Sequence, residues 1–312
     1  MIGTGTVPLA MITRSGNIDN FHRGAVVVCD RDDRVLYSAG DPDFIACMRS
    51  SCKIIQAIPV IECGAADAYG FDDVEVALIC ASHPGGEQQI AGVRSMLNKA
   101  SVPESALKSG LGINDNCSGK HTGMLAAIQF FGEVIDSYLD RSHPHQQRIL
   151  DCFCDLAGIR SASVGIATDG CGAPIFFTPI RAAAKAFAKI ATPDSFQPGP
   201  RREAVERIAR AICAHSEMTG EPNHREMLGG RDIVLTKAGG SGYLAAGVLG
   251  KGIGAAVKIE DGTGTPVRPV LFEALRRANA ISEEDACALI RNVTPKILNR
   301  AGLEIGRFEL LF

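Results

Sequence analysis

Apolar and polar positions alternate like β-strands towards both ends of the chain and recur at helical spacing through its middle. Residues 24–29 and 35–38 are rich in β-branched side chains and flank a charged link, which predicts an early hairpin. Residues 234–237, 243–248 and 253–260 are separated by glycine-rich turns, which is typical of antiparallel strands. The pattern therefore predicts that the N-terminal and C-terminal strands share one antiparallel sheet.

The segments between these strands have the apolar spacing of amphipathic helices. Pro59 interrupts the first of them, so we expect a kink or a helix end there. His143-Pro144-His145 is interpreted as a helix entry rather than a metal pair, because proline is common in the first helical turn. Helices are predicted at 43–65, 72–81, 87–100, 123–139, 146–156, 180–191, 201–215, 268–279 and 282–291, with one more strand at 164–168.

These elements predict an α/β fold in which an antiparallel sheet of N- and C-terminal strands carries packed helices and an inserted helical lobe. The 312 residues are enough for one large domain or two modest ones with a substantial buried core, and we expect a single domain, 1–312. The sequence contains no internal repeat and no low-complexity tail.

The amino-acid composition indicates which binding partners are disfavoured and which cellular compartment is expected. The net charge is −3, no basic run exceeds two residues and tryptophan is absent, which disfavours nucleic acid and anionic membranes. The eleven cysteines are an odd number in apolar surroundings, so we expect mostly free thiols in a reducing, cytoplasmic protein. No apolar run reaches transmembrane length, and residues 1–10 lack the features of a signal peptide.

The stretch from Asn116 to Gly123 gathers a thiol, a hydroxyl, an amine and an imidazole into five consecutive positions at a loop-to-helix junction. Cys117 and Lys120 could join Cys171, from a later Asp-Gly-Cys motif, around a zinc ion, which thiolates bind well. A lysine ligand must be neutral, and its usual pKa of about 10.4 makes that cost roughly 4–5 kcal/mol at about pH 7. Because the spacing matches no standard zinc motif, spacing alone favours two ordinary buried thiols.

Candidate nucleophiles lie elsewhere in the sequence. Ser50 and Lys53 are three positions apart, so on a helix the lysine could reach the hydroxyl and, with a lowered pKa, act as its base. Ser82 follows a helical segment and could project into a cleft, and Lys258 lies near the end of a strand. Ordinary explanations stay open, with Ser50 as a helix cap and Ser82 in a helix C-terminus. The K-T-G signature of serine β-lactamases is absent, because Ile-Glu follows Lys258.

Taken together and in this order, the motifs resemble the Rhizobium-type L-asparaginases, a structural class distinct from the bacterial threonine type and the Ntn-hydrolase type. The resemblance extends over nearly the whole chain, and the motifs are specific jointly although each alone is weak. They are Arg49-Ser50-Ser51-Cys52-Lys53, Cys80-Ala81-Ser82-His83, Asn116-Cys117-Ser118-Gly119-Lys120-His121-Thr122-Gly123-Met124-Leu125, Asp169-Gly170-Cys171-Gly172-Ala173-Pro174 and Val257-Lys258-Ile259-Glu260-Asp261-Gly262.

The resemblance implies a homodimer with a fold related to serine β-lactamases and glutaminases. It also implies two Ser-Lys tandems, Ser50 with Lys53 and Ser82 with Lys258. In the implied reaction, L-asparagine is hydrolysed to L-aspartate and ammonia. Ser50, activated by Lys53, would attack the amide carbon, and the second tandem would move protons to the leaving ammonia or from the deacylating water.

The resemblance further implies a zinc ion beside the substrate pocket, with water completing its coordination. The implied protein ligands are Cys117, Lys120 and Cys171. Asp169 would hold the water next to the substrate, and Arg49 and His121 are expected to contact the substrate or its α-carboxylate. Zinc would position the substrate, whereas in a rival mechanism a zinc-activated water attacks directly.

Two other functions stay open at this point. A glutaminase or another serine amidase would carry the same groups, because selectivity for side-chain length is not readable from the sequence. A non-catalytic, zinc-containing amino-acid-binding protein is the alternative from another class. A closed site with four protein ligands would favour it.

Overall fold

The structure is a computed structural model that describes residues 5–312 of the chain. It divides into two compact units, which we name the sheet unit and the helical unit. The sheet unit comprises Met1–Ser51, Thr178–Ala191 and His224–Phe312. The helical unit comprises Cys52–Phe177 and Thr192–Asn223.

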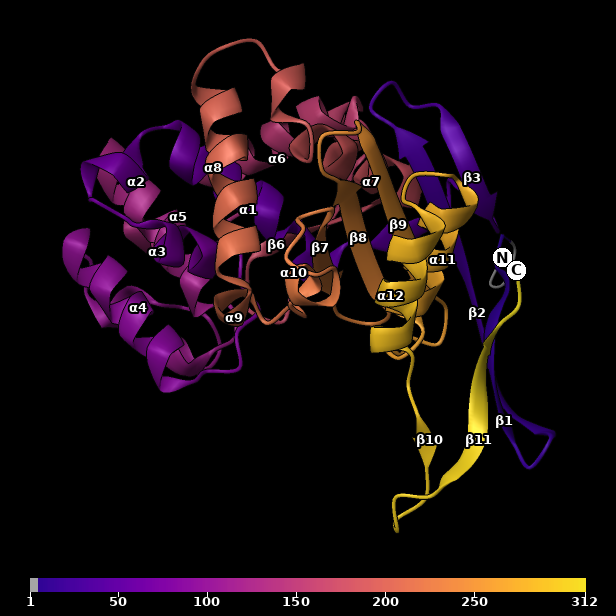
Figure 1. Cartoon of the computed structure of the whole chain (residues 1–312). Helices are drawn as coiled ribbons and strands as arrows, with labels where there is room; N and C mark the ends of the chain where they lie inside the picture. Colours follow the sequence, from indigo (N-terminus) through magenta and orange to yellow (C-terminus); the bar gives the residue numbers. More distant parts are fainter. Residues whose placement is uncertain (1–4) are drawn as a thin grey trace. The chain divides into compact units, whose positions relative to one another are not determined.

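The sheet unit is built on eight strands, seven of which follow the order β10-β11-β1-β2-β9-β8-β7, while β3 pairs with β2 (Figure 1). All the strand pairs described within it are antiparallel. N-terminal and C-terminal strands therefore share one sheet, as predicted. The strands are β1 (Val7–Arg14), β2 (Asn17–Asp30), β3 (Val35–Ala39), β7 (Val234–Gly239), β8 (Tyr243–Val248), β9 (Ile253–Ile259), β10 (Ile297–Leu298) and β11 (Glu304–Leu310).

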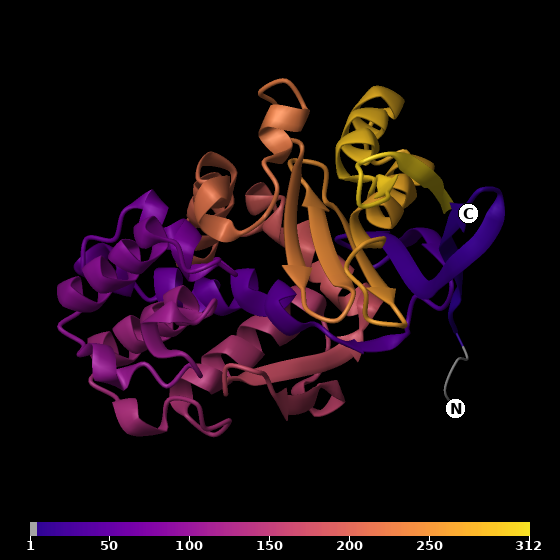
Figure 2. The same ribbon diagram turned by 90° about the horizontal axis from the view of Figure 1, so that it is seen from below.

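One face of this sheet is covered by α11 (Val267–Arg277), and α12 (Glu283–Val293) packs on α11. Figure 2 shows them as the yellow helices beside the orange strands. Val26, Val257 and Leu244 lie opposite one another on three neighbouring strands and belong to the apolar cluster that these helices complete. Burial of this cluster stabilises the unit because it removes apolar surface from water.

The opposite face carries α7 (Ile180–Ile190), which approaches the strands closely. Gly247 and Gly254 lie opposite each other on β8 and β9. A Cβ on Gly254 would lie 2.0 Å from the backbone oxygen of Ala184, so the contact depends on glycine. The sheet unit also contains β4 (Ile45–Cys47) and α10 (His224–Met227).

The helical unit supplies the helical lobe that the sequence predicts. Pro144 opens one of its helices, as expected, and the Asp-Gly-Cys motif lies in the turn between two short antiparallel strands. These strands are β5 (Gly165–Thr168) and β6 (Pro174–Pro179). The helices are α1 (Lys53–Glu62), α2 (Ala65–Ala68), α3 (Asp73–Ile79), α4 (Glu87–Lys99), α5 (Ser118–Phe131), α6 (Pro144–Ala157), α8 (Pro200–Ala214) and α9 (Ser216–Thr219).

Two glycines of α5 bring its backbone against α3. A Cβ on Gly119 would lie 2.3 Å from the backbone oxygen of Leu78, and one on Gly123 would lie 2.7 Å from Cγ2 of Ile79. A side chain at position 119 would push the helices apart, because the Leu78 backbone oxygen cannot yield, and one at position 123 would force the fully buried Ile79 side chain to move.

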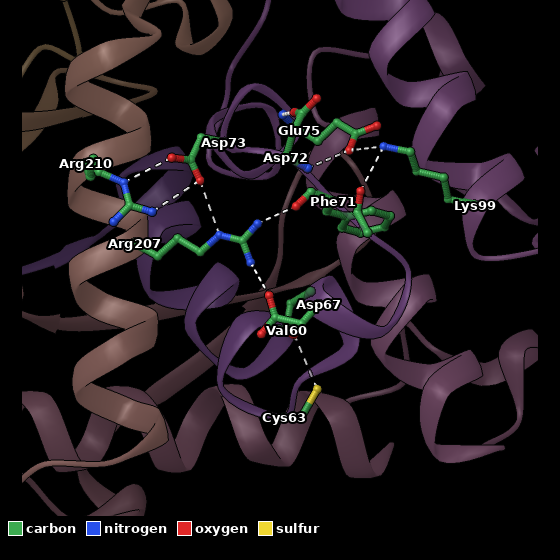
Figure 3. A network of polar contacts seen from close by, with 11 residues as sticks. Val60, Cys63, Asp67, Phe71, Asp72, Asp73, Glu75, Lys99, Arg207 and Arg210 are labelled. Atoms are coloured by element: carbon green, nitrogen blue, oxygen red, sulfur yellow. Dashed lines mark hydrogen bonds and ion pairs between the residues drawn. The ribbon is translucent and has the colours of Figure 1, made fainter.

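Charged side chains fix the N-terminal end of α3, as Figure 3 shows. Asp72 and Glu75 form a capping box in which each side chain accepts the other residue's backbone N–H. Arg207 and Arg210 of α8 both donate to Asp73 and lower its pKa, with the hydrogen bond from Arg210 the largest cause. α3 is thereby fixed to α8, which holds in place the motif that follows α3.

The helix predicted at 43–65 is wrong at its start. Residues 45–47 form a strand, and Arg49 has a positive φ of 48°, which lies outside the right-handed α-helical region. The α-helix begins only at Lys53. Pro59 lies inside α1 but does not end it.

The helix predicted at 123–139 is displaced towards the N-terminus. It begins at Ser118 and ends at Phe131, because Gly132 adopts the left-handed conformation that closes a helix. Most of the reactive stretch is therefore helical. The sequence pattern also missed β1, β6, β10, β11 and residues 17–23 of β2.

The eleven cysteines all lie within the described residues and none is joined in a disulfide, in agreement with the prediction from their odd number and apolar surroundings. Within residues 5–312, no helix combines the length and the apolar character needed to cross a bilayer.

We expect Gly254→Ala to lower the free energy of unfolding by about 2 kcal/mol or more, because the new methyl group overpacks the contact with α7. Gly264→Ala is the matched control, since a Cβ there meets nothing within 4 Å. It should change stability by less than about 0.5 kcal/mol. Denaturant unfolding followed by circular dichroism measures both, and equal losses would contradict the packing argument.

Candidate active site

Lys53 is the first residue of α1, and its side chain is fully buried. Its Nζ donates to the Ser82 hydroxyl over 3.0 Å and to the backbone oxygens of Ala81 (2.7 Å) and Asn116 (3.1 Å). These oxygens compensate the amine for the water it loses on burial. Lys53 therefore joins the residues after α3 to the segment that precedes α5.

Ser50 lies in the short 3-10 helix Arg49–Cys52, directly ahead of α1, and is partly buried. The serine hydroxyl that Lys53 contacts is that of Ser82, which the resemblance pairs with Lys258. The structure thus joins one member of each expected tandem. The pairings of Ser50 with Lys53 and of Ser82 with Lys258 remain predictions.

His83 is buried, and both of its ring nitrogens form hydrogen bonds. The Gly85 N–H donates to Nδ1 over 3.2 Å, so Nε2 carries the proton and donates to the Ser118 hydroxyl over 3.0 Å. Burial, followed by the positive charge of Lys53, lowers the pKa of His83 to about 4. The imidazole is therefore neutral at physiological pH and is a fixed donor to α5.

Cys117, Lys120 and Cys171 meet in the helical unit and are all buried. Lys120 Nζ lies 3.0 Å from Cys171 Sγ. The hydrogen bond from Cys117 lowers the pKa of Cys171 strongly, and the same bond raises the pKa of Cys117. Burial lowers the pKa of Lys120, but its interactions with Cys171 and then Cys117 outweigh burial, and the net shift is upward. Without a metal ion, the cluster is a thiol, a thiolate and an ammonium.

His121 lies against this cluster in a defined tautomer. The Lys108 N–H donates to the Tyr138 hydroxyl oxygen over 3.0 Å, and that hydroxyl lies 2.7 Å from His121 Nδ1. The hydroxyl proton therefore goes to Nδ1, which leaves the ring proton on Nε2. Among the described residues Nε2 is buried with no hydrogen-bond partner. Asp169 Oδ2, on the other side, is 3.8 Å from Cys171 Sγ.

Metal binding at this cluster depends on the lysine. In the part of the chain that the structure describes, no three Cys, His, Asp or Glu side chains gather as a metal would require. Two sulfurs and the Lys120 amine nevertheless face one another, and sulfur with nitrogen is a donor set that suits zinc. A dication would replace the protons now on Cys117 and Lys120, so the residues fit the ion.

Two lysines of the sheet unit share the sheet face that carries α7. Tyr243 of β8 lies opposite Lys258 of β9 on one side and opposite Gly239 of β7 on the other, so these three side positions share one face. Lys237 is two positions from Gly239 and so points to the same face. Lys237 is buried and was not singled out from the sequence. The available signal was a lysine inside an otherwise apolar strand that ends in Gly-Gly.

Lys258 is held by the backbone around it. Its Nζ donates to the backbone oxygens of Ser241, over 2.7 Å, and Ile259. Burial lowers its pKa, and the nearby Asp261 carboxylate partly offsets this. Arg49, expected at the substrate, has Nη1 3.5 Å from the Ser241 hydroxyl.

Comparison with known proteins gives a family match over almost the whole chain. The model of the family described as L-asparaginase II matches residues 10–310. This match confirms the resemblance that the sequence motifs indicated. A search of curated proteins gave no match.

Solved structures offer more distant likenesses. A native form of Mglu in 4.3 M NaCl is 13% identical, with a TM-score of 0.46, and the match covers 78% of this chain and 58% of that one. A glutamate form of Mglu gives 14% identity, a TM-score of 0.47 and coverages of 88% and 63%. A probable glutaminase from Bacillus subtilis, complexed with 6-diazo-5-oxo-L-norleucine, gives 12%, 0.37, 87% and 84%. The chain thus spans less than two thirds of these Mglu chains, and likenesses this distant assign no activity.

We expect the protein to lose stability as the pH falls from about 6.5 towards about 4. Folded His83 stays neutral down to about 4, and burial, chiefly, lowers the pKa of His145 to about 3. The unfolded chain takes up these protons near the ordinary histidine pKa of 6.5, so acid favours the unfolded state. Stability from both groups is fully present above pH 6.5 and declines below it.

The measurement is the melting temperature between about pH 7.5 and about pH 4.5, compared with His145→Gln. His145 is fully buried, and neither ring nitrogen has a partner among the described residues. The variant should lose less of its melting temperature than the wild type over this range. Equal losses would show that His145 does not contribute.

Proposed function

The chain belongs to the L-asparaginase II family, and we propose that it is an amidohydrolase that converts L-asparagine to L-aspartate and ammonia. The observation that carries the proposal is the part-buried hydrogen bond between Lys53 Nζ and the Ser82 hydroxyl. Lys53 also binds the backbone oxygen of Asn116, the residue before Cys117, so this pair lies next to the cysteine–lysine cluster. A serine, an amine and a metal-binding cluster in one place suit amide hydrolysis.

In the proposed reaction, Lys53 first gives up to solvent one of the three protons that its ammonium donates in the resting protein, and the neutral amine then takes the proton of the Ser50 hydroxyl as that oxygen attacks the side-chain amide carbon. The carbon–nitrogen bond then breaks, and ammonia leaves with a proton returned through Lys53 and Ser82, which are already hydrogen-bonded. Water next attacks the ester on Ser50 and releases L-aspartate. Lys258 would act with Ser82 in these proton transfers, and Lys237 is a second candidate for that role because it is buried on the same sheet face.

Ser82 is the rival nucleophile, because its hydroxyl is the one that contacts Lys53. In that arrangement Ser50 would take part in proton transfer instead. Both versions form and hydrolyse an ester, so they differ only in which serine carries the acyl group.

Cys117, Lys120 and Cys171 would hold the zinc ion. When bound, zinc would act as a Lewis acid that polarises a substrate oxygen or its own water. Asp169, close to Cys171, would orient that water. His121 would donate from Nε2, the nitrogen left free to do so by the Tyr138 hydroxyl, and Arg49 is proposed to bind the α-carboxylate.

Homodimer formation, implied by the family resemblance, is part of the same proposal. Hydrolysis of L-glutamine is the alternative activity. The non-enzymatic alternative is a protein that binds an amino acid and catalyses no reaction.

We expect Ser50→Ala to lower kcat for L-asparagine by about 10³-fold or more, because loss of a nucleophile removes the covalent route. Ammonia release from the purified protein measures this, with L-glutamine tested in parallel. Ser142→Ala, at an exposed serine, is the control and should keep full activity. Stronger release from glutamine would support the alternative activity, and no release from either amide would contradict the proposal.

The same assay separates the serines and the lysines. Acyl-enzyme trapped on Ser82, together with activity retained by Ser50→Ala, would make Ser82 the nucleophile. Comparison of Lys237→Ala with Lys258→Ala identifies which lysine acts in proton transfer, since the catalytic one should lose more activity.

Removal of zinc should expose two reactive sulfurs. We expect about one zinc per chain by elemental analysis, and chelation should raise the rate at which thiol reagents label Cys117 and Cys171. Cys287 is exposed and should label equally before and after chelation. Cys171→Ala should lose the metal, and unchanged labelling after chelation would argue against zinc at this cluster.

A further inference from the structure

The backbone just ahead of Ser50 is held in an unusual conformation. Arg49 has a φ of 48°, in the left-handed region that bulky residues rarely adopt. Ser51 closes the turn by donating to the Met48 backbone oxygen from both its N–H (3.1 Å) and its hydroxyl (2.6 Å). Strained backbone persists only where surrounding contacts hold it, so neighbouring residues must support Arg49 in this conformation.

That support is the turn between β7 and β8, residues 239–242, which belongs to the same unit. A Cβ on Gly239 would lie 2.5 Å from the Met48 backbone oxygen, so the absence of a side chain is what lets the two backbones meet. A Cβ on the neighbouring Gly240 would be 3.5 Å from the Arg49 guanidinium carbon, an ordinary contact. The Ser241 hydroxyl lies 3.5 Å from Nη1 of Arg49.

The turn is itself held in place by hydrogen bonds from β9 and the residue that ends it. Lys258 Nζ donates to the Ser241 backbone oxygen over 2.7 Å, and the Ile259 N–H donates to the Gly242 backbone oxygen over 2.8 Å. Ser241 and Gly242 both have positive φ, 57° and 70°, which gives the turn a defined and tight shape. Contacts therefore run without a gap from Lys258 through the turn to the residue before Ser50.

We propose that residues 239–242 form a rigid support for the backbone of Ser50, with Gly239 and Ser241 as positioning residues. In this proposal Lys258 helps to position Ser50 through its hydrogen bond to the turn, in addition to any role in proton transfer. The inference rests on the proposed function in assigning catalysis to Ser50. Small displacements of a reacting group lower rates steeply, so loosening this support should lower kcat more than it changes KM.

Gly239→Ala and Gly240→Ala are a matched pair for the test, because neither glycine has a positive φ and both gain the same methyl group. We expect Gly239→Ala to lower kcat by about 10- to 100-fold with KM changed less than about threefold. Gly240→Ala should stay within about twofold of the wild type in both constants, since its methyl group makes only ordinary contact. Equal kinetics in the two variants would overturn the proposal.

Hydrogen exchange supplies a readout that does not depend on activity. The Ser51 N–H is bonded to the Met48 oxygen, so peptides covering residues 48–53 should exchange about tenfold faster in Gly239→Ala and remain unchanged in Gly240→Ala. A Cβ on Gly239 would also lie 3.0 Å from the Tyr243 Cβ. Peptides of β8 must therefore keep their slow exchange for the effect to be assigned to the support. Faster exchange in β8 alone would overturn it.

Ser241→Gly tests the support without adding atoms. Glycine accepts the positive φ at this position, so the fold is kept while the hydroxyl that faces Arg49 is lost. A severalfold loss of kcat with faster exchange at residues 48–53 is expected, and unchanged values would remove Ser241 from the proposal. If the wild type hydrolyses no amide, the proposed function fails, but the exchange comparison still decides whether the support exists.

Discussion

The candidate site of the helical unit depends on the hydrogen bonds that the buried amine of Lys53 donates. A buried amine needs several oxygen partners, and Lys53 takes them from residues just after α3 and from the segment before α5. Those partners include the Ser82 hydroxyl, so one requirement of electrostatics also sets the position of a candidate catalytic group. The adjacent His83 is kept neutral by burial and by the same positive charge.

The cysteine–lysine cluster follows a similar rule. The Lys120 ammonium and the Cys171 thiolate stabilise each other while Cys117 stays a neutral thiol, and the Tyr138 hydroxyl orients His121. The protonation states of these groups therefore depend on the hydrogen bonds and charges of their neighbours. Such a network is rigid, which is the property that a site for a small polar substrate requires.

The sequence predicted the long amphipathic helices and the central strands because burial imposes a period that can be read directly. It failed where tertiary contact overrides the local pattern, as in β1 and β11, which pair over a distance of nearly the whole chain. Site residues were identified as members of motifs, yet the contact of Lys53 with Ser82 depends on how α1 and α3 pack. Lys237 was missed because a lone lysine in a strand has no motif to announce it, and only burial shows its unusual position.

The close packing of α5 on α3 has a consequence for how variation in this protein should be interpreted. Gly119 and Gly123 flank Lys120 and His121, and a methyl group would collide with the Leu78 backbone at the first glycine and with the buried Ile79 side chain at the second. A mutational survey scored by activity would therefore find Gly119 and Gly123, which carry no reactive group, as intolerant of substitution as Lys120 and His121. Substitutions along this helix can lower activity either by removing a reactive group or by disturbing the packing on α3. Only a measurement of stability at each position separates these two causes.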